Sequence, residues 1–327
     1  MPDPDIHKFL KEIEQEAQNK FRSPLSKDSE ANTSITGSDI KKNVNSTKAD
    51  LTDNLINIKN SDSSNLSIQL PSVVVITALH NPELKAVLRV FKCEWGKELR
   101  EGILYKTGIA EFDNCSAQII VASQNEMGMV PAAILTTKAL ISWQPQLIAM
   151  TGICAGVRDK VNLGDLIVAK QVLDYGSGKL RENGFVPDYT TISLDGNCTE
   201  YLKVFSDKQD LAHTIRSKWE TEVGRPQTEM RIHFGVIASG AAVIAKSEFV
   251  EEIQEYKRSI LGIDMEAFGV AKAAESAFPH KITWMIIKGI QDYADNQKSN
   301  EYREYSAFVS AQFLKMFLEE HMTALVK

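Results

Sequence analysis

The chain has 327 residues, of which 43% are hydrophobic and 24% charged, and a formal net charge of −6 at pH 7. This length and apolar share suffice for one large α/β domain or two ordinary domains with a sizeable core. The mild acidity argues against binding nucleic acid, which requires clustered Lys and Arg, and no apolar run approaches the roughly 18 residues of a membrane span.

The N-terminus and the cysteines indicate a soluble cytoplasmic protein. Residues 1–20 are polar and charged, unlike the apolar core of a signal peptide. The four cysteines lie far apart without CxxC spacing, which favours reduced thiols over a disulfide framework or a zinc site. The six histidines are scattered, with no HxH or HxxxH pair, so we expect neither a metal site nor a cofactor.

Residues 1–70 are predicted to form a polar N-terminal arm that precedes a catalytic domain at 71–327. Residues 23–67 are rich in Ser, Asn, Asp and Lys and lack aromatic residues, a composition that buries little surface. Apolar residues at near-helical spacing predict two short helices, within 5–22 and 49–58. The simpler interpretation is that these helices pack loosely on the main domain. The alternative is a regulatory arm that binds a protein partner.

From residue 72 onward, apolar strands alternate with amphipathic helices. The predicted strands are 73–78, 103–112, 117–123, 147–152, 165–175, 233–241 and 281–290, and the predicted helices are 83–93, 129–143, 248–259, 265–277 and 303–324. The strand at 147–152 is expected to end in a turn of small residues at 151–156. This alternation predicts an α/β fold, a three-layer α/β/α sandwich whose central sheet is mixed and mostly parallel.

Four predicted strand ends carry the motifs that could do chemistry. They are TALHNPEL with Glu83, the glycine turn MTGICAG, IDMEAF with Asp264, Met265 and Glu266, and KGIQDYAD with Lys288, Asp292 and Asp295. Ligands of open α/β sheets bind where strands end. Carboxylates at three separate strand ends can therefore converge on one pocket.

Together these motifs resemble the nucleoside phosphorylase superfamily and, within it, the methylthioadenosine/S-adenosylhomocysteine nucleosidases. The resemblance covers about residues 72–325, and the four motifs follow the family's order at compatible spacing. Residues 157–179 and the segment KGIQDYADNQKSNEY further resemble a subgroup attached to bacterial immune and signalling proteins. Some members of that subgroup release adenine from adenine nucleotides, including ATP.

The resemblance assigns roles to particular residues. Asp292 is expected to be the general acid that protonates purine N7, which requires a carboxyl whose pKa is raised by partial burial. Glu83 would activate the attacking water, Glu266 would hold the ribose diol, and Met265 would pack under the sugar. The other expected substrate-binding residues are Val243 and Ile244 at the base, together with Gly128, Gly152, Ile153, His80 and Arg158.

Each of these residues also has a purely structural interpretation. Asp292 could cap a helix that follows the last strand. Glu266 could be a first-turn carboxylate, and Met265 could fill the core. Glu83 could be solvated. The four motifs taken jointly favour the family's chemistry, while Asp264, Asp295 and Lys288 are assigned structural roles.

Three departures from the family pattern affect the interpretation. TALHNPEL has one residue more before its Glu, which leaves the position of Glu83 open. Ile153 replaces a Ser in the glycine turn, and this favours water over phosphate as the nucleophile. Basic residues after the motifs could form a rim that binds phosphate, namely Arg158, Lys160, Lys179 and Lys246.

The leading hypothesis is therefore a purine nucleosidase that cleaves an adenine nucleoside or nucleotide, with ATP and AMP as candidate substrates and defence as the setting. The alternatives are a methylthioadenosine/S-adenosylhomocysteine nucleosidase, a phosphorolytic enzyme and a nucleoside sensor without catalysis. The family also implies a homo-oligomer. The expected partner is a small purine nucleoside or nucleotide, with neither nucleic acid nor membrane involved.

Overall fold

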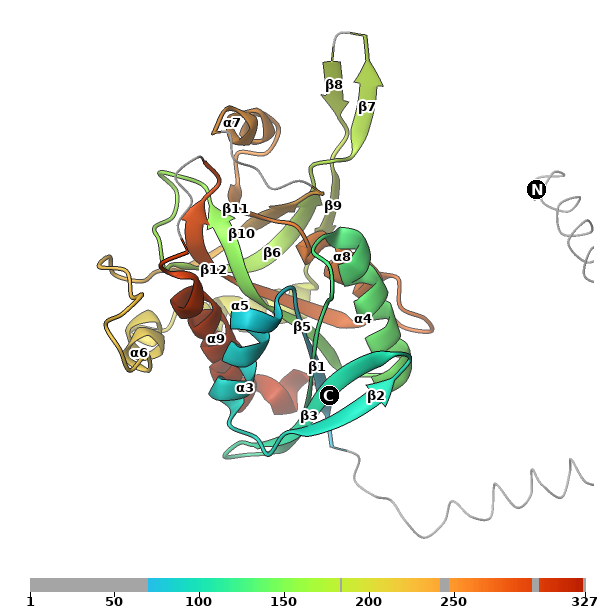
Figure 1. Ribbon diagram of the computed structural model, residues 1–327, viewed down its shortest axis with the longest axis vertical. Coiled ribbons are helices and arrows are strands. Elements are labelled where there is room, and N and C mark those ends of the chain that lie inside the picture. Colours follow the sequence, from blue (N-terminus) through green and yellow to red (C-terminus); the bar gives the residue numbers. More distant parts are fainter. Residues whose placement is uncertain (1–69, 183, 242–246, 296–299, 326–327) are drawn as a thin grey trace, which may run out of the picture. The chain divides into compact units, whose positions relative to one another are not determined.

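The computed structural model describes residues 70–182, 184–241, 247–295 and 300–325 (Figure 1). The predicted arm lies outside these residues except for Leu70, and so do both helices predicted within it. Within the described ranges, no helix is both long enough and apolar enough to cross a membrane.

A large mixed sheet forms the centre of the domain. Its strands run in the order β11-β10-β6-β12-β5-β1-β4-β3-β2, and β9 pairs with β6. The strands are β1 (Ser72–Thr77), β2 (Gly96–Arg100), β3 (Ile103–Glu111), β4 (Ser116–Ser123), β5 (Leu147–Gly156), β6 (Leu166–Asp174), β9 (Thr190–Ser193), β10 (Ile232–Ser239), β11 (Ile260–Asp264) and β12 (Thr283–Tyr293). Two further strands, β7 (Gly178–Arg181) and β8 (Gly184–Pro187), form a hairpin that projects from the domain.

The sheet closes on itself at one end. The pairs β4–β1, β1–β5, β5–β12, β6–β10 and β10–β11 are parallel, whereas β12–β6 and the outer pairs β4–β3 and β3–β2 are antiparallel. Because β11 also pairs with β5, the strands β5, β12, β6, β10 and β11 form a closed ring. This ring brings the carboxyl end of β11 to those of the neighbouring strands β5 and β12, from which it would lie far apart in an open sheet.

Helices cover both faces of the sheet, as the sandwich prediction requires. On one side, α4 (Met129–Trp143) packs against α8 (Ala267–Glu275), and on the other, α3 (Lys85–Phe91) packs against α9 (Arg303–Leu325) (Figure 1). The other helices of the described residues are η1 (His80–Leu84), α5 (Gly196–Ser206), α6 (Leu211–Ser217) and α7 (Ser247–Tyr256). The predicted three-layer α/β/α fold is therefore confirmed.

The apolar strands are buried on both faces. Every residue of β1 is buried, and nearly all of β5 and β12 are buried as well. Unbroken apolar runs are typical of strands that are covered by helices on either side. The N-terminal half of α9 is also buried, from Tyr305 to Leu314, because it lies between the sheet and helices α3, α5 and α6.

Two predicted strand boundaries were wrong, and both lie where the site forms. The segment 151–156, predicted to be a turn, belongs to β5, which continues to Gly156. Strand β12 continues past Ile290 to Tyr293 with a register shift between Ile290 and Asp292. Small residues suggested a turn in β5, but they are needed there because other groups approach its backbone closely.

Helices α4 and α8 touch at a glycine, which generates a stability prediction. A Cβ at Gly269 of α8 would lie 2.2 Å from the Met129 carbonyl oxygen of α4, so Gly269→Ala must push the helices apart. Overpacking of this kind costs about 1–3 kcal/mol. Gly196→Ala is the matched control, since nothing lies within 4 Å of its added Cβ, and we expect it to be neutral or slightly stabilising. Urea unfolding of both variants tests this, and equal stabilities would contradict it.

Candidate active site

The carboxyl ends of β1, β5, β11 and β12 surround a cavity. Four acidic residues contribute to its wall, and most of the remaining wall is apolar. The lining residues are Ala78, Leu79, Glu83, Met127, Ile153, Cys154, Ala155, Ile263, Asp264, Met265, Glu266, Gln291, Asp292, Ala294 and Arg303. The carboxylates from three strand ends thus converge on one pocket, as the sequence predicted.

Glu83 reaches the cavity through a π-turn. Helix η1 has an i→i+5 hydrogen bond, in which the Leu84 N–H donates to the Leu79 carbonyl at 3.1 Å. A π-turn accommodates one residue more than an α-turn. The extra residue between β1 and Glu83 is taken up in this way, and the carboxylate still faces the other acids.

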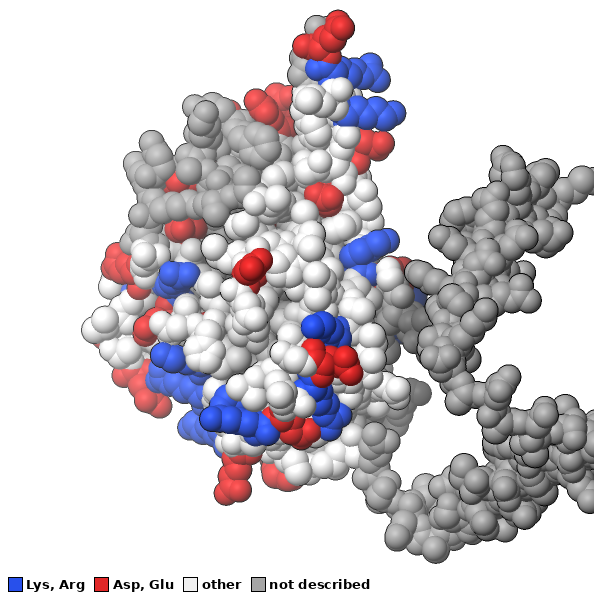
Figure 2. Space-filling model, turned by 45° about the vertical axis from the view of Figure 1, so that its right-hand side comes forward, with Lys and Arg blue, Asp and Glu red and all other residues white. Residues whose placement is uncertain are grey.

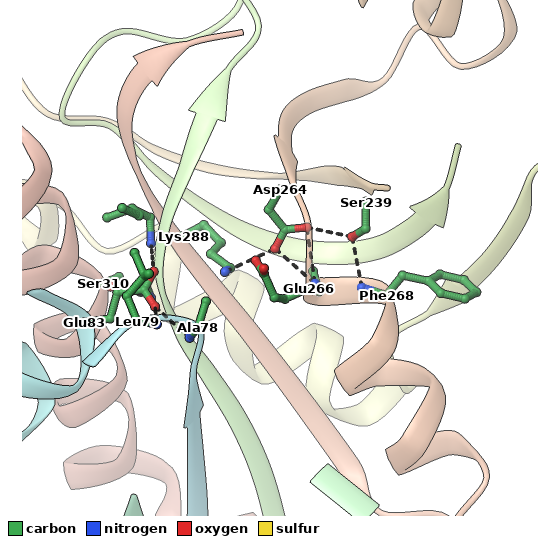
Figure 3. Close-up of polar contacts among 12 residues, drawn as sticks. Ala78, Leu79, Glu83, Ser239, Asp264, Glu266, Phe268, Lys288 and Ser310 are labelled. Atoms are coloured by element: carbon green, nitrogen blue, oxygen red, sulfur yellow. Dashed lines mark hydrogen bonds and ion pairs between the residues drawn. The ribbon is translucent and has the colours of Figure 1, made fainter. Parts of the chain in front are cut away.

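Three backbone amides hold the Glu83 carboxylate in place (Figure 3). Oε2 accepts hydrogen bonds from the N–H groups of Ala78 at 2.7 Å and Leu79 at 2.8 Å, and Oε1 accepts one from Ile153 at 2.9 Å. Burial raises the pKa of Glu83, while the charge of Lys288 and these amides act in the opposite direction. The carboxyl is therefore fixed in orientation and shifted toward the range of a useful base.

Gly152 allows this close approach. A Cβ at Gly152 would lie 2.1 Å from Oε1 of Glu83, so any larger residue would displace the carboxylate. The Gly152 N–H donates to Oγ of Ser310 on α9 at 3.0 Å. Gly152 thus lies behind Glu83 and outside the cavity wall, whereas the side chain of Ile153 lines the wall.

Glu266 is anchored to the start of α4. Its Oε1 accepts hydrogen bonds from the Gly128 N–H at 2.8 Å and from Nε2 of Gln124 at 3.3 Å. Gly128 precedes α4 with a φ of 119°, a conformation that favours glycine. Burial, reinforced by the negative charge of Asp264, raises the pKa of Glu266 to about 7.

A fully buried lysine lies among these acids. Nζ of Lys288 is 3.1 Å from Oδ2 of Asp264, and Asp264 also accepts hydrogen bonds from Oγ of Ser239 at 2.7 Å and from the Ala267 N–H at 3.0 Å (Figure 3). Burial alone lowers the pKa of Lys288. The negative charges of Asp264, Glu83 and Glu266 outweigh burial and raise the pKa above its ordinary value, so the ammonium group stays charged.

Asp292 enters the cavity from strand β12. It is buried and pairs in register with Ala155 of β5, which in turn pairs with Ile263 of β11. Nε2 of Gln291 donates to its Oδ2 at 3.3 Å. The register shift between Ile290 and Asp292 is a local irregularity of the strand. Irregularities of this kind commonly change the direction in which a side chain points from a sheet. The helix-cap interpretation does not hold, because Asp292 lies inside a strand.

Several residues of the predicted site lie elsewhere. His80 is exposed and borders a separate hollow next to β3 and α4. Arg158 pairs with Asp295 and lies over the ring of Tyr293, with its guanidinium carbon 4.2 Å from the ring centroid. Val243 and Ile244 lie outside the described residues.

The described members of the predicted basic rim do not line the cavity. Nζ of Lys160 donates to the backbone carbonyls of Arg258 and Ile260. Lys179 is exposed on the projecting β7–β8 hairpin, whose charged side chains stand out at the top of Figure 2. Lys246 lies outside the described residues. Among the described residues, the basic side chain in the cavity wall is that of Arg303, which the sequence motifs did not single out.

Among the described residues, no group of His, Cys, Asp and Glu is arranged to hold a metal ion. Backbone N–H groups donate hydrogen bonds to the carboxylates of Glu83 and Glu266. The carboxylate of Asp264 accepts a hydrogen bond from the Ser239 hydroxyl and pairs with Lys288.

Comparison with known proteins identifies the family. A profile of the Phosphorylase superfamily matches residues 72–319. The chain belongs to the phosphorylase superfamily. This membership agrees with the order of the four motifs.

Similar members of the superfamily include nucleosidases. The ATP nucleosidase Cap17 of Escherichia coli is 27% identical, over 77% of this chain and 52% of that protein. A 5′-methylthioadenosine/S-adenosylhomocysteine nucleosidase of Haemophilus influenzae is 26% identical, over 61% of this chain and 80% of that protein. The chain spans about half the length of the first curated relatives it matches.

A solved structure shares the fold. The crystal structure of the Helicobacter pylori 5′-methylthioadenosine/S-adenosylhomocysteine nucleosidase superimposes with a TM-score of 0.59 at 22% identity, covering 77% of this chain and 99% of that chain.

The raised pKa of Glu266 predicts a pH-dependent cost in stability. Between the ordinary pKa of a glutamate, 4.5, and its folded-state pKa of about 7, the folded protein keeps a proton that the unfolded chain releases, so stability falls as pH rises through this window. Glu266→Gln removes this loss, and its stability advantage over the wild type should grow by about 1–3 kcal/mol between pH 5 and pH 8.

Urea unfolding at several pH values measures this difference. Glu229→Gln is the control, because Glu229 is exposed outside the cavity and its variant should follow the wild type throughout. A constant difference for Glu266→Gln across the pH range would contradict the prediction.

The burial of Lys288 generates a second prediction for this site. Lys288→Met leaves the Asp264 carboxylate buried without its counter-ion, which costs about 3–5 kcal/mol. Adding Asp264→Asn should recover part of that loss. Lys281→Met breaks an exposed pair with Glu275 and should change the free energy of unfolding by less than about 0.5 kcal/mol. A single Lys288→Met variant as stable as Lys281→Met would disprove the counter-ion role.

Proposed function

We propose that the chain is a purine nucleosidase, which hydrolyses the N-glycosidic bond of an adenine nucleoside or nucleotide to adenine and a ribosyl product. The observation that supports this most directly is the convergence of Glu83, Glu266 and Asp292 on one cavity. ATP and AMP are the leading candidate substrates, since a relative that matches most of this chain is named an ATP nucleosidase. Defence as the biological setting stays a prediction from the sequence.

Asp292 acts as the general acid in this proposal. As the bond between C1′ and N9 breaks, its electron pair moves into the purine, and Asp292 donates a proton to N7. A carboxyl can hold that proton near neutral pH when it is withdrawn from water. The burial of Asp292 at the end of β12 supports this role.

Glu83 acts as the general base. Water adds to C1′ through its oxygen, and its proton passes to Glu83. A carboxylate oxygen has two acceptor positions, and Oε1 uses one of them for the Ile153 N–H, so the other is available for water. The three amides fix the whole carboxylate in place, which supplies the positioning that the step requires.

The remaining residues bind the sugar and balance charge. Glu266 accepts hydrogen bonds from the ribose hydroxyls, and Met265 packs against the ring. Lys288 stabilises the ionised form of Glu83, which is the form that can accept the proton. The transition state carries positive charge on the ribose, so the surrounding carboxylates lower its energy.

Ile153 favours water over phosphate as the nucleophile. Its side chain presents only carbon to the cavity, and its N–H is already bonded to Glu83. A phosphorolytic enzyme needs donors for inorganic phosphate at this turn. Hydrolysis therefore fits this wall of the cavity better than phosphorolysis.

A methylthioadenosine/S-adenosylhomocysteine nucleosidase is the second candidate. The Haemophilus influenzae relative of that name aligns over 80% of its own length. The apolar residues Met127 and Leu79 in the cavity wall suit a thioether substituent. The N-terminal arm as a partner-binding segment, the catalytic domain at 71–327 and the homo-oligomer stay predictions.

The test is adenine release measured by chromatography. The purified full-length chain is incubated with ATP, AMP, adenosine, methylthioadenosine and S-adenosylhomocysteine, each with and without inorganic phosphate. We expect release without phosphate, and a fall of at least about 100-fold in Asp292→Asn, since general acid catalysis contributes factors of about 10²–10⁴.

Asp113→Asn is the matched control, because Asp113 is exposed between β3 and β4 and should not affect release. Strict dependence on phosphate would indicate a phosphorylase. Binding of substrates without any release would indicate a sensor, and either result would overturn the proposal.

A further inference from the structure

Arg303 places a guanidinium group in the wall of the cavity. It is the first residue of α9 and is partly buried, and its Nε has no hydrogen-bond partner among the described residues. Several other arginines, by contrast, have carboxylate partners: Arg158 pairs with Asp295, Arg100 with Glu98, and Arg225 with Glu222. Arg303 therefore keeps donors available for a ligand.

The positive charge of Arg303 would not help the proposed reaction at the base or at the anomeric carbon. Positive charge develops on the ribose as the bond breaks, and the leaving purine gains a proton. A guanidinium group beside either position would oppose both changes through charge repulsion. A neutral nucleoside therefore gains nothing from a cation in this wall.

The remaining part of the substrate is the group on the 5′ carbon. In the proposed mechanism, Asp292 engages the base, Glu266 engages the ribose hydroxyls and Glu83 engages the water. Each of these positions is already served by a carboxylate. The substituent that a cation matches must be anionic, and in a nucleotide that substituent is the 5′-phosphate.

We propose that Arg303 binds the 5′-phosphate and thereby makes the cavity selective for adenine nucleotides over nucleosides. This inference rests on the proposed function. Guanidinium groups form charge-assisted and often bidentate hydrogen bonds to phosphate oxygens. The position of Arg303 at the N-terminal end of a 23-residue helix adds the favourable partial charge of the helix dipole.

The test compares nucleotide and nucleoside substrates in Arg303 variants. In Arg303→Met, kcat/KM for AMP should fall by about 10–100-fold, the effect of a lost hydrogen bond to a charged group. The value for adenosine should change by less than about threefold. Arg303→Lys keeps the positive charge but lacks the paired N–H donors of the guanidinium group. Its kcat/KM for AMP should lie between those of the wild type and Arg303→Met.

Arg258→Met serves as the control, since Arg258 is exposed at the surface outside the cavity and should leave both substrates unaffected. Equal losses for AMP and adenosine in Arg303→Met would show that Arg303 supports the cavity without selecting phosphate. Unchanged values for both substrates would also overturn the inference.

A binding measurement separates this inference from the proposed function. Calorimetric titration of AMP and adenosine is carried out with Asp292→Asn, alone and combined with Arg303→Met. Weaker AMP binding with unchanged adenosine binding supports the phosphate role, even if the wild-type protein releases no adenine. If Asp292→Asn binds AMP no more tightly than adenosine, the inference is wrong, whatever the release assay shows.

Discussion

The site depends on one buried ammonium group. Glu83, Asp264 and Glu266 all lie near Lys288, in a region from which water is largely excluded. Buried carboxylates repel one another strongly and tend to take up protons. Lys288 allows part of this set to remain ionised, because its own positive charge is stabilised by the acids around it. The sequence motifs predict a structural role for Lys288, and the structure makes it the counter-ion of the buried acids.

The closed ring of strands explains how these groups meet. Asp292 pairs with Ala155, and Ala155 pairs with Ile263, the residue before Asp264. One short stretch of β5 thus sets the separation between the acids of β11 and β12. The same strand supplies the Ile153 N–H to Glu83, so a single rigid element positions three of the four acidic side chains. Sites on strands are held more precisely than sites on loops.

Sequence patterns predicted the long apolar helices and strands well. They predicted the glycine-containing end of β5 and the short exposed strands poorly. The helix at 129–143 has the predicted bounds, since its apolar periodicity is strong and Pro131 suits a first turn. The segment TGICAG was misread because glycine usually marks a turn, whereas Gly152 here makes room for Glu83. The short, exposed strands β2 and β7 lack the alternation that would have predicted them.

The site residues divide in the same way. Glu83, Glu266 and Asp292 were predictable because motifs at strand ends carry them. The π-turn that contains Glu83 was not predictable, because one extra residue in a loop has no periodicity of its own. Arg303 was missed for a related reason: it follows a polar segment, and its importance arises only from the fold, which brings the start of α9 to the cavity.

Lys288 and Arg303 differ in what they neutralise. Lys288 is fully buried, and Asp264 lies within ion-pair distance, so its charge is used within the protein itself. Arg303 lies in the wall with an unsatisfied Nε, so its charge matches a group that the substrate brings. A cavity with only the first cation suits a neutral nucleoside. Adding the second cation leaves the chemistry at C1′ unchanged and favours the binding of a substrate that carries a phosphate. One side chain can therefore change the substrate specificity of the cavity.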